Sequence, residues 1–124
     1  MGELSLMQVA VNASDLDRAE KFYRDILELE FVARFEPPGL LFFRAGSTRI
    51  LLETGAPAST LYYEVADLRV QCEALEQKGI VLTSEPHKIH TDASGLFGAP
   101  GVEEWMAFCN DSEGNVIGFV ERRG

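Results

Sequence analysis

Apolar residues in this chain fall into short runs separated by clusters of Gly, Pro, Asp and Ser. Runs of this length with such boundaries predict β-strands. The runs lie at residues 6–11, 31–35, 40–44, 49–53, 61–65, 80–83, 105–109 and 116–121. The pattern therefore predicts four strands in each half of the chain.

After the first strand of each half, the apolar spacing changes to steps of three and four residues, which indicate an amphipathic helix. These positions are Leu16, Ala19, Phe22, Tyr23, Ile26 and Leu27 in the first half, and Leu68, Cys72 and Leu75 in the second. Ser14 or Asp15 suits the first N-cap and Asp67 the second, while Gly79 suits a helix end.

Each half thus consists of a strand, a helix and three strands, and the dipeptide Asp-Leu recurs at residues 15–16 and 67–68. The small residues 55–59 are interpreted as a linker between module one, about 1–55, and module two, about 60–124. We expect one α+β domain over residues 1–124, in which two βαβββ modules form a curved, trough-like mixed sheet with the helices on its outer face. Such a trough is a natural place for a ligand.

Residues 86–101 are rich in Gly, Pro, Asp and Ser, and they are interpreted as a long loop. Loops of this length are uncommon in compact domains and are often lids or binding loops. This segment is therefore expected to influence ligand specificity.

The composition narrows the classes of function. The chain has 124 residues and a formal net charge of −9, which makes free nucleic acid a poor partner because phosphate binding needs a basic surface. No apolar stretch is long enough to span a membrane, and residues 1–6 lack the basic region of a signal peptide. A cytoplasmic protein without a membrane partner is expected, with Cys72 and Cys109 as buried apolar residues.

Two segments resemble a known family. Residues 11–29, VNASDLDRAEKFYRDILEL, look like the entry helix of the vicinal oxygen chelate superfamily, which contains glyoxalase, bleomycin-resistance and dioxygenase proteins. Residues 111–121, DSEGNVIGFVE, look like its closing hairpin, which usually has the form Asp-Pro-x-Gly-Asn followed by a strand with a glutamate. The resemblance covers nearly the whole chain and implies the doubled βαβββ fold.

The resemblance also implies a divalent metal ion (Mn, Mg, Ni or Zn) held by the first and fourth strands of each half. Carried over by position, the ligands are Gln8, Glu53 and Glu121, with Thr60 where metal enzymes of the family usually have histidine. The three oxygen ligands suit a hard ion better than zinc. Glu53 or Glu121 is the expected catalytic proton carrier; each also has a simple interpretation as a surface carboxylate, and Gln8 as a polar strand residue.

Four residues are candidates for a ligand pocket: His87, Trp105, Tyr62 and Phe43. In an extended chain, residues three apart face opposite ways, so His87 and His90 are not expected to face the same side without a turn. Arg44, Arg49 and Lys88 are possible contacts for an anionic substrate, although exposed strand charge is the simpler interpretation.

Two functions remain open. One is a metal-dependent lyase or isomerase, similar to glyoxalase I or methylmalonyl-CoA epimerase, that acts on a small oxygenated substrate through an enolate-like intermediate. The alternative is a metal-free small-molecule binding protein similar to bleomycin-resistance proteins, which Thr60 and the acidic charge favour. A ring-cleaving dioxygenase fits less well, because its iron needs two histidines that Gln8 and Thr60 do not provide. A homodimer is expected for either function.

Overall fold

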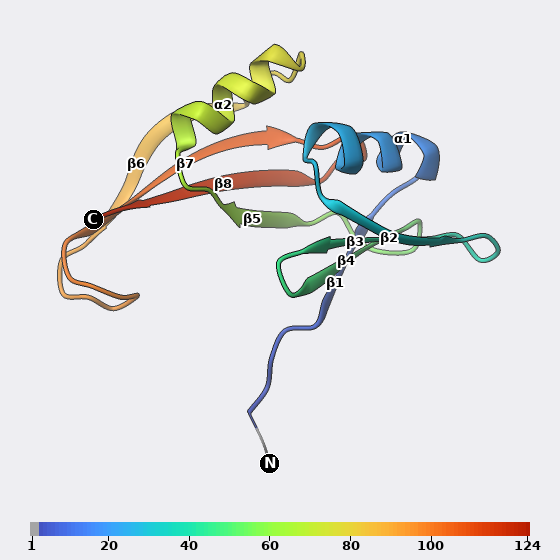
Figure 1. The fold of residues 1–124 in the computed structure, drawn as a ribbon, viewed down its shortest axis with the longest axis horizontal. Helices are drawn as coiled ribbons and strands as arrows, with labels where there is room; N and C mark the ends of the chain where they lie inside the picture. The colour runs from blue at the N-terminus through green and yellow to red at the C-terminus, as the bar shows by residue number, and fades with distance from the viewer. Residues whose placement is uncertain (1–2) are drawn as a thin grey trace. The chain divides into compact units, whose positions relative to one another are not determined.

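Each half of the chain folds into a four-stranded mixed sheet with its own helix (Figure 1). The computed structural model describes residues 3–124. The first unit runs up to Ser59 and also includes Asp111–Asn115, while the second contains Thr60–Asn110 and Val116–Gly124. The expected α+β class and the repeated βαβββ module are confirmed.

The first unit contains one sheet with the strand order β1-β4-β3-β2. Strand β1 is parallel to β4, and the other pairs are antiparallel. Its elements are β1 (Gln8–Asn12), α1 (Leu16–Lys21), η1 (Phe22–Ile26), β2 (Glu30–Phe35), β3 (Leu40–Ala45) and β4 (Thr48–Glu53).

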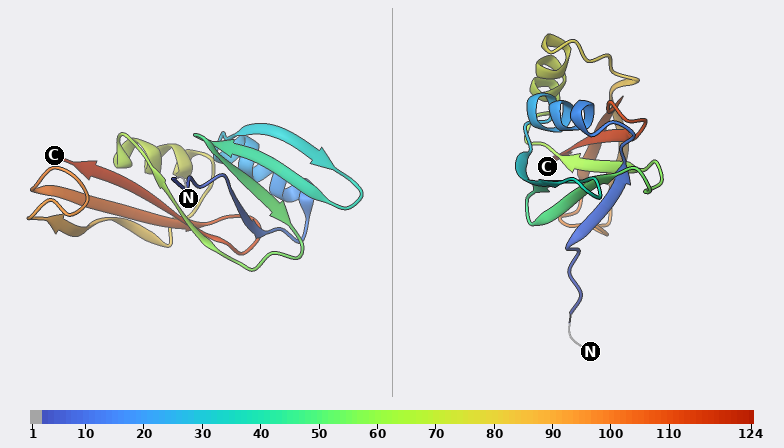
Figure 2. Two further views of the ribbon diagram at one scale, coloured as in Figure 1. Left: turned by 90° about the horizontal axis from the view of Figure 1, so that it is seen from below. Right: turned by 90° about the vertical axis from the view of Figure 1, so that its right-hand side faces the viewer.

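The second unit repeats this topology in the strand order β5-β8-β7-β6, with β5 parallel to β8. Its elements are β5 (Thr60–Glu64), α2 (Leu68–Gln77), β6 (Ser84–Asp92), β7 (Val102–Asn110) and β8 (Val116–Arg123). Within each unit, the helix covers one face of the sheet, which we call the helix-facing side (Figure 2). The opposite face of each sheet is called the helix-free side.

The helix-facing side of the first sheet forms the core of that unit. The buried apolar residues on it are Val11, Leu41, Phe43, Ile50 and Leu52. The Tyr23 ring packs against Phe43, with ring centroids 5.8 Å apart. Because strand side chains alternate between faces, the helix-free side carries Gln8, Ala10 and Asn12 from β1, as well as Arg49, Leu51 and Glu53 from β4.

The first predicted helix is present but changes geometry along its length. Asp15 caps it, accepting a hydrogen bond from the Arg18 N–H at 3.0 Å. After Lys21 the chain continues as a π-helical turn, in which the Leu27 N–H bonds to the Phe22 carbonyl at 3.1 Å. This wider turn buries two neighbouring aromatic residues, Phe22 and Tyr23, in the same core.

The segment after the second helix differs from the prediction. Residues 80–83 do not form a strand. Strand β6 instead runs through Ser84–Asp92 and includes residues 86–92, the first part of the predicted loop. Pro86 lies inside this strand, which is an edge strand with a register shift between Ser84 and His87. A proline is tolerated there because no neighbour needs its missing N–H. Only residues 93–101 remain as the connecting loop.

Among the described residues, no helix combines the length and the hydrophobicity needed to cross a bilayer.

Candidate functional site

The first unit does not bring its two predicted metal ligands together. In the parallel pairing of β1 with β4, Gln8 lies opposite Arg49, whereas Glu53 lies opposite Asn12. Gln8 and Glu53 are therefore four residues apart along the strands, which is roughly 13 Å at the usual rise per residue. Ligands of one ion lie within about 2.6 Å of it, so side chains that stand roughly perpendicular to the sheet do not share an ion at this separation.

The second unit places its two predicted metal positions, Thr60 and Glu121, on opposite faces of its sheet. Thr60 lies opposite Val116, on the helix-free side with Tyr62 and Gly118. Glu121 lies five residues further along β8, on the helix-facing side with Ile117 and Phe119. Its Oε1 accepts a hydrogen bond from the backbone N–H of Leu68 at 2.6 Å, and its Oε2 accepts one from Arg123. The carboxylate of Glu121 therefore caps the start of α2.

A capping role for Glu121 makes a testable prediction. Replacing Glu121 with alanine removes the acceptor of the Leu68 N–H and should lower the free energy of unfolding by about 1–2 kcal/mol. Glu64→Ala, on an exposed position of β5, is the matched control and should change it by less than about 0.5 kcal/mol. Urea unfolding of both variants measures the difference, and equal stabilities would contradict the capping role.

The residues present do not fit the implied metal ion. Neither unit brings its two candidate ligands to one point, and Glu121 is engaged by an N–H donor and a guanidinium. Within residues 3–124, no group of three or more His, Cys, Asp or Glu side chains has the arrangement of a metal site. The metal site stays a prediction that this geometry does not support, and no chemical step is assigned to Glu53 or Glu121.

Two of the four predicted pocket residues lie elsewhere. Phe43 is fully buried in the core of the first unit, because strand alternation turns it towards the helix and leaves Phe42 on the helix-free side. Trp105 lies opposite Glu121, on the helix-facing side of the second sheet. There the Arg123 guanidinium stacks 4.1 Å above its ring, and its indole N–H donates to Glu103. Phe43 is therefore corrected from a pocket residue to a core residue.

The other two predicted residues lie on the helix-free side of the second sheet. Tyr62 is 59% exposed and lies in one row with Gly118 and Phe108 across three adjacent strands. The rings of Tyr62 and Phe108 meet edge to face with centroids 6.0 Å apart. His87 is opposite Met106 on the same side of the sheet. We call Tyr62, Phe108, Met106 and His87 the aromatic face of the second unit.

Gly118 makes the aromatic face possible. A Cβ atom at this position would lie 2.7 Å from Tyr62 Cδ1 and 2.9 Å from Phe108 Cε1, closer than carbon atoms pack. Both rings therefore pack directly against the backbone of β8 at Gly118. Sequence reasoning missed Gly118, although a glycine inside a strand is a signal for close approach by another group.

His90 joins His87 on the helix-free side, contrary to expectation. His87 pairs with Met106 and His90 with Glu104, with a register shift between Lys88 and His90. Met106 and Glu104 are two residues apart and share a face, so the bulge turns both histidines the same way. The His90 ring also meets the Phe97 ring of the following loop, with centroids 6.1 Å apart.

The loop at residues 93–101 is organised by one buried carboxylate. Asp92 is 2% exposed, and it accepts hydrogen bonds from the backbone N–H groups of Leu96 at 2.7 Å and Phe97 at 2.8 Å. These N–H donors lower the pKa of Asp92 below its ordinary value. The Arg122 side chain donates to the Phe97 carbonyl at 3.0 Å and holds the loop to β8.

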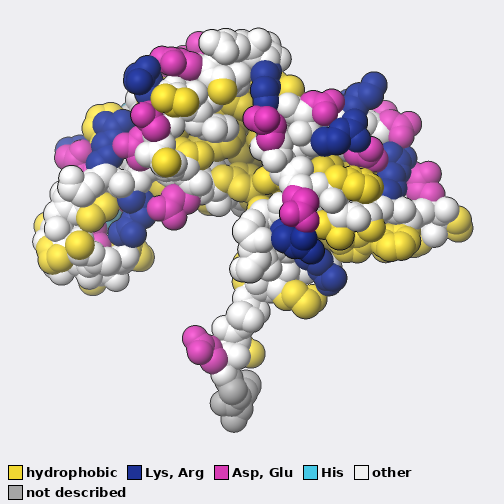
Figure 3. Space-filling view, viewed as in Figure 1, with side chains coloured by type: hydrophobic (Ala, Val, Ile, Leu, Met, Phe, Trp, Pro, Cys, Tyr) yellow, Lys and Arg dark blue, Asp and Glu magenta, His cyan; other side chains and the backbone are white. Residues whose placement is uncertain are grey.

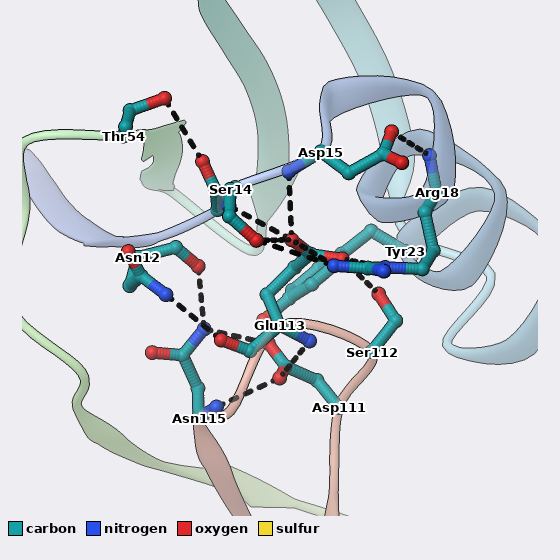
Figure 4. Close-up of polar contacts among 11 residues, drawn as sticks. Asn12, Ser14, Asp15, Arg18, Tyr23, Thr54, Asp111, Ser112, Glu113 and Asn115 are labelled. Carbon is teal, nitrogen blue, oxygen red and sulfur yellow. Dashed lines mark hydrogen bonds and ion pairs between the residues drawn. The ribbon is translucent and has the colours of Figure 1, made fainter.

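A second polar cluster surrounds the turn between β7 and β8, which belongs to the first unit (Figure 4). The side chain of Glu113 is fully buried and accepts hydrogen bonds from the backbone N–H groups of Ser14 at 2.9 Å and Asp15 at 3.0 Å. The Arg18 Nε donates to it at 2.6 Å, and the Ser112 hydroxyl donates at 3.0 Å. Burial alone would raise the pKa of Glu113, but these donors lower it to about 2.

The same turn carries two further buried polar residues. Asp111 accepts hydrogen bonds from the Tyr23 hydroxyl at 2.6 Å and from the backbone N–H of Glu113 at 2.8 Å. The Asn115 amide donates to the Asn12 carbonyl at 2.8 Å and accepts from the Ser59 N–H at 3.0 Å. The turn thus ties together β1, the start of α1 and the linker, which gives the Asp-x-Glu-Gly-Asn motif a structural role.

A shallow polar hollow also lies in the first unit, beside the start of α1. Its lining includes Asp17, Arg34 and Glu36. Arg34 forms ion pairs with Asp17 at 2.9 Å and with Glu36 at 2.7 Å, so the charges of the hollow are already matched. We therefore do not assign it a ligand.

Solved structures with the same fold include two proteins with stated functions. A lactoylglutathione lyase from Agrobacterium tumefaciens is 22% identical, with a TM-score of 0.73 over 98% of this chain and 96% of that chain. TnmS3, an antibiotic-binding protein from Streptomyces sp. CB03234, is 20% identical, with a TM-score of 0.74 over 98% of both chains. At these identities the likeness shows the fold alone.

A family model identifies the superfamily of the chain, which these structures do not. No curated protein matches the chain. A family model, however, matches residues 5–119, which is nearly the whole sequence and includes all of residues 11–29 and most of residues 111–121. The chain therefore belongs to the Glyoxalase/Bleomycin resistance protein/Dioxygenase superfamily.

Proposed function

We propose that this protein binds a small, planar aromatic molecule without the help of a metal ion. The observation that carries the proposal is the row of Tyr62, Gly118 and Phe108, in which a glycine makes room for two rings and leaves one of them 59% exposed. A large exposed aromatic side chain on a sheet face is suited to stacking on a flat ligand. The antibiotic-binding protein with the same fold supports binding as a function of this architecture.

The charge of the chain favours a cationic aromatic ligand for this face. The formal net charge of −9 raises the local concentration of cations around the protein. Among the four residues of the aromatic face, only His87 can carry a positive charge, and only when it is protonated. A homodimer stays a prediction for this protein.

Bleomycin and ethidium, both cationic and both carrying planar rings, are the probes for this proposal. We expect each to bind, and we expect Tyr62→Ala to weaken binding by about tenfold or more because the stacking surface is lost. Tyr62→Phe keeps the ring and should bind like the unchanged protein. Isothermal titration calorimetry measures the affinities.

The control is Val81→Ala, which shortens another exposed apolar side chain of the second unit, one that lies outside the aromatic face. It should leave the affinity unchanged. Failure of both probes to bind, or equal binding by Tyr62→Ala, would overturn the proposal.

The alternative function, a metal-dependent lyase or isomerase, requires the metal site that the strand registers do not support. Elemental analysis of the purified protein and titration with Mn²⁺, Ni²⁺ and Zn²⁺ distinguish the two. Metal uptake that depends on both Gln8 and Glu53 would favour the enzyme.

A further inference from the structure

Arg49 stands apart from the other arginines of the chain. Within residues 3–124 it forms no ion pair, whereas every other arginine does: Arg18, Arg24, Arg34, Arg44, Arg69, Arg122 and Arg123. The chain carries almost twice as many acidic as basic residues, so carboxylates are plentiful. An arginine that remains without one keeps its charge available for another anion.

The surroundings of Arg49 leave polar groups unsatisfied. Its Nε is buried and has no hydrogen-bond partner, and the same is true of the Oε1 atom of Gln8. These two residues are register partners on the helix-free side of the first sheet. A buried donor without a partner is costly, so a ligand towards which the Arg49 side chain turns its Nε–H would supply a missing interaction. Rotation of the Gln8 amide would present its N–H₂ group to the same ligand.

Basic and aromatic side chains lie next to one another on the helix-free side of the first sheet, around Arg49. Arg44 is opposite Arg49 in the pairing of β3 with β4, so both guanidinium groups lie in one row with Gln8. The Arg49 guanidinium lies 5.7 Å from the centre of the Phe42 ring, and Phe35 meets Phe42 with centroids 6.0 Å apart. In Figure 3, basic side chains gather over the β3–β4 hairpin beside a hydrophobic area.

From this arrangement we propose that Arg49, Gln8 and Phe42 form a binding site for a planar aromatic carboxylate. The carboxylate accepts hydrogen bonds from the Arg49 guanidinium, with Gln8 beside it, and the ring of the ligand packs on Phe42 and Phe35. Arginine suits this role because its planar donors match the two oxygens of a carboxylate. A guanidinium next to Gln8 also repels a divalent cation, which agrees with the poor fit of a metal ion in this unit.

The site lies in the first unit and uses no residue of the aromatic face, so it stands independently of the proposed function. The probes are naphthoate and naphthamide, which share a ring system and differ in charge. We expect naphthoate to bind about tenfold more tightly or better, as for a charge-assisted hydrogen bond. The preference should weaken as salt is added, because part of it is electrostatic.

Arg49→Met should abolish the preference for naphthoate, Arg49→Lys should keep part of it, and Gln8→Leu should reduce it. Arg69→Met removes an exposed arginine of α2 and should leave it unchanged. Tyr62→Ala should also leave it unchanged, which separates this site from the aromatic face. Calorimetry gives the affinities.

A measurement on the unchanged protein covers the case in which the Arg49 variants fold poorly. Naphthoate, but not naphthamide, should shift the Nε–Hε NMR resonance of Arg49. Equal affinities for the two probes, a preference that survives in Arg49→Met, or an Arg49 resonance that naphthoate does not move would each overturn the proposal. So would Mn²⁺ binding that Gln8→Leu abolishes.

Discussion

Replacing Glu113 with alanine is expected to lower the free energy of unfolding by about 3 kcal/mol. The substitution leaves the backbone N–H groups of Ser14 and Asp15 without their acceptor. It also removes the ion-pair partner of Arg18, whose Nε lies 2.6 Å from Glu113 Oε2. Most of the loss should come from the buried donors, because the Arg18 side chain is 53% exposed and can turn to water.

Unfolding in urea, followed by circular dichroism, measures this loss. Glu76→Ala is the matched control, since Glu76 is an exposed glutamate on α2, and it should change stability by less than about 0.5 kcal/mol. Arg18→Met should cost less than Glu113→Ala, because a surface ion pair contributes about 1 kcal/mol or less. If Glu113→Ala were as stable as Glu76→Ala, the buried network would have no role in stability.

The contribution of Glu113 should also depend on pH. Its pKa falls from an ordinary value of 4.5 to about 2 in the folded protein. A depressed folded-state pKa means that the stabilisation is fully present above the unfolded pKa and is lost as pH falls through the folded one. The difference in stability between the unchanged protein and Glu113→Gln should therefore be constant above about pH 5 and shrink steadily between about pH 4.5 and 2.

The sequence was sufficient to predict the repeated module, because its helices and most strands follow regular apolar spacing. Asp67 was correctly predicted as an N-cap, and Gly79 adopts the positive φ expected at a helix end. Glu113, in contrast, enters the sequence analysis only as part of the segment that resembles the closing hairpin. Its partners Ser14, Asp15 and Arg18 lie more than ninety residues away in the chain, and no local pattern indicates such contacts.

The candidate metal site shows a second limit of prediction from sequence, which is that strand register cannot be inferred from the apolar pattern. The resemblance placed Gln8 and Glu53 at matched strand ends, but only the strand pairing decides whether two side chains meet. In that pairing Gln8 lies opposite Arg49. A shift of register by an even number of residues, here four, keeps every side chain on its face while it replaces a carboxylate neighbour with a guanidinium. The same pairing explains why Arg49, an ordinary strand charge in the sequence, becomes the centre of a proposed site.

Filling the space above Gly118 is expected to have the second large effect, on the aromatic face of the second unit. Gly118→Ala places a Cβ atom where the rings of Tyr62 and Phe108 now lie, and Gly118→Val adds two more carbons. Overpacking of this kind costs about 1–3 kcal/mol. Because Tyr62 is already 59% exposed, we expect its ring to swing outward, so that binding of ethidium falls by about tenfold or more.

Gly55→Ala is the control for replacing a glycine, since nothing lies within 4 Å of the added Cβ there. It should leave both stability and binding unchanged. The double variant Gly118→Ala with Tyr62→Ala separates crowding from a general weakness of the strand. If the Tyr62 ring causes the strain, the second substitution should cost less in the presence of the first than it does alone. Additive losses of stability, measured by urea unfolding, would mean that Gly118 serves the backbone of β8 and not the two rings that rest on it.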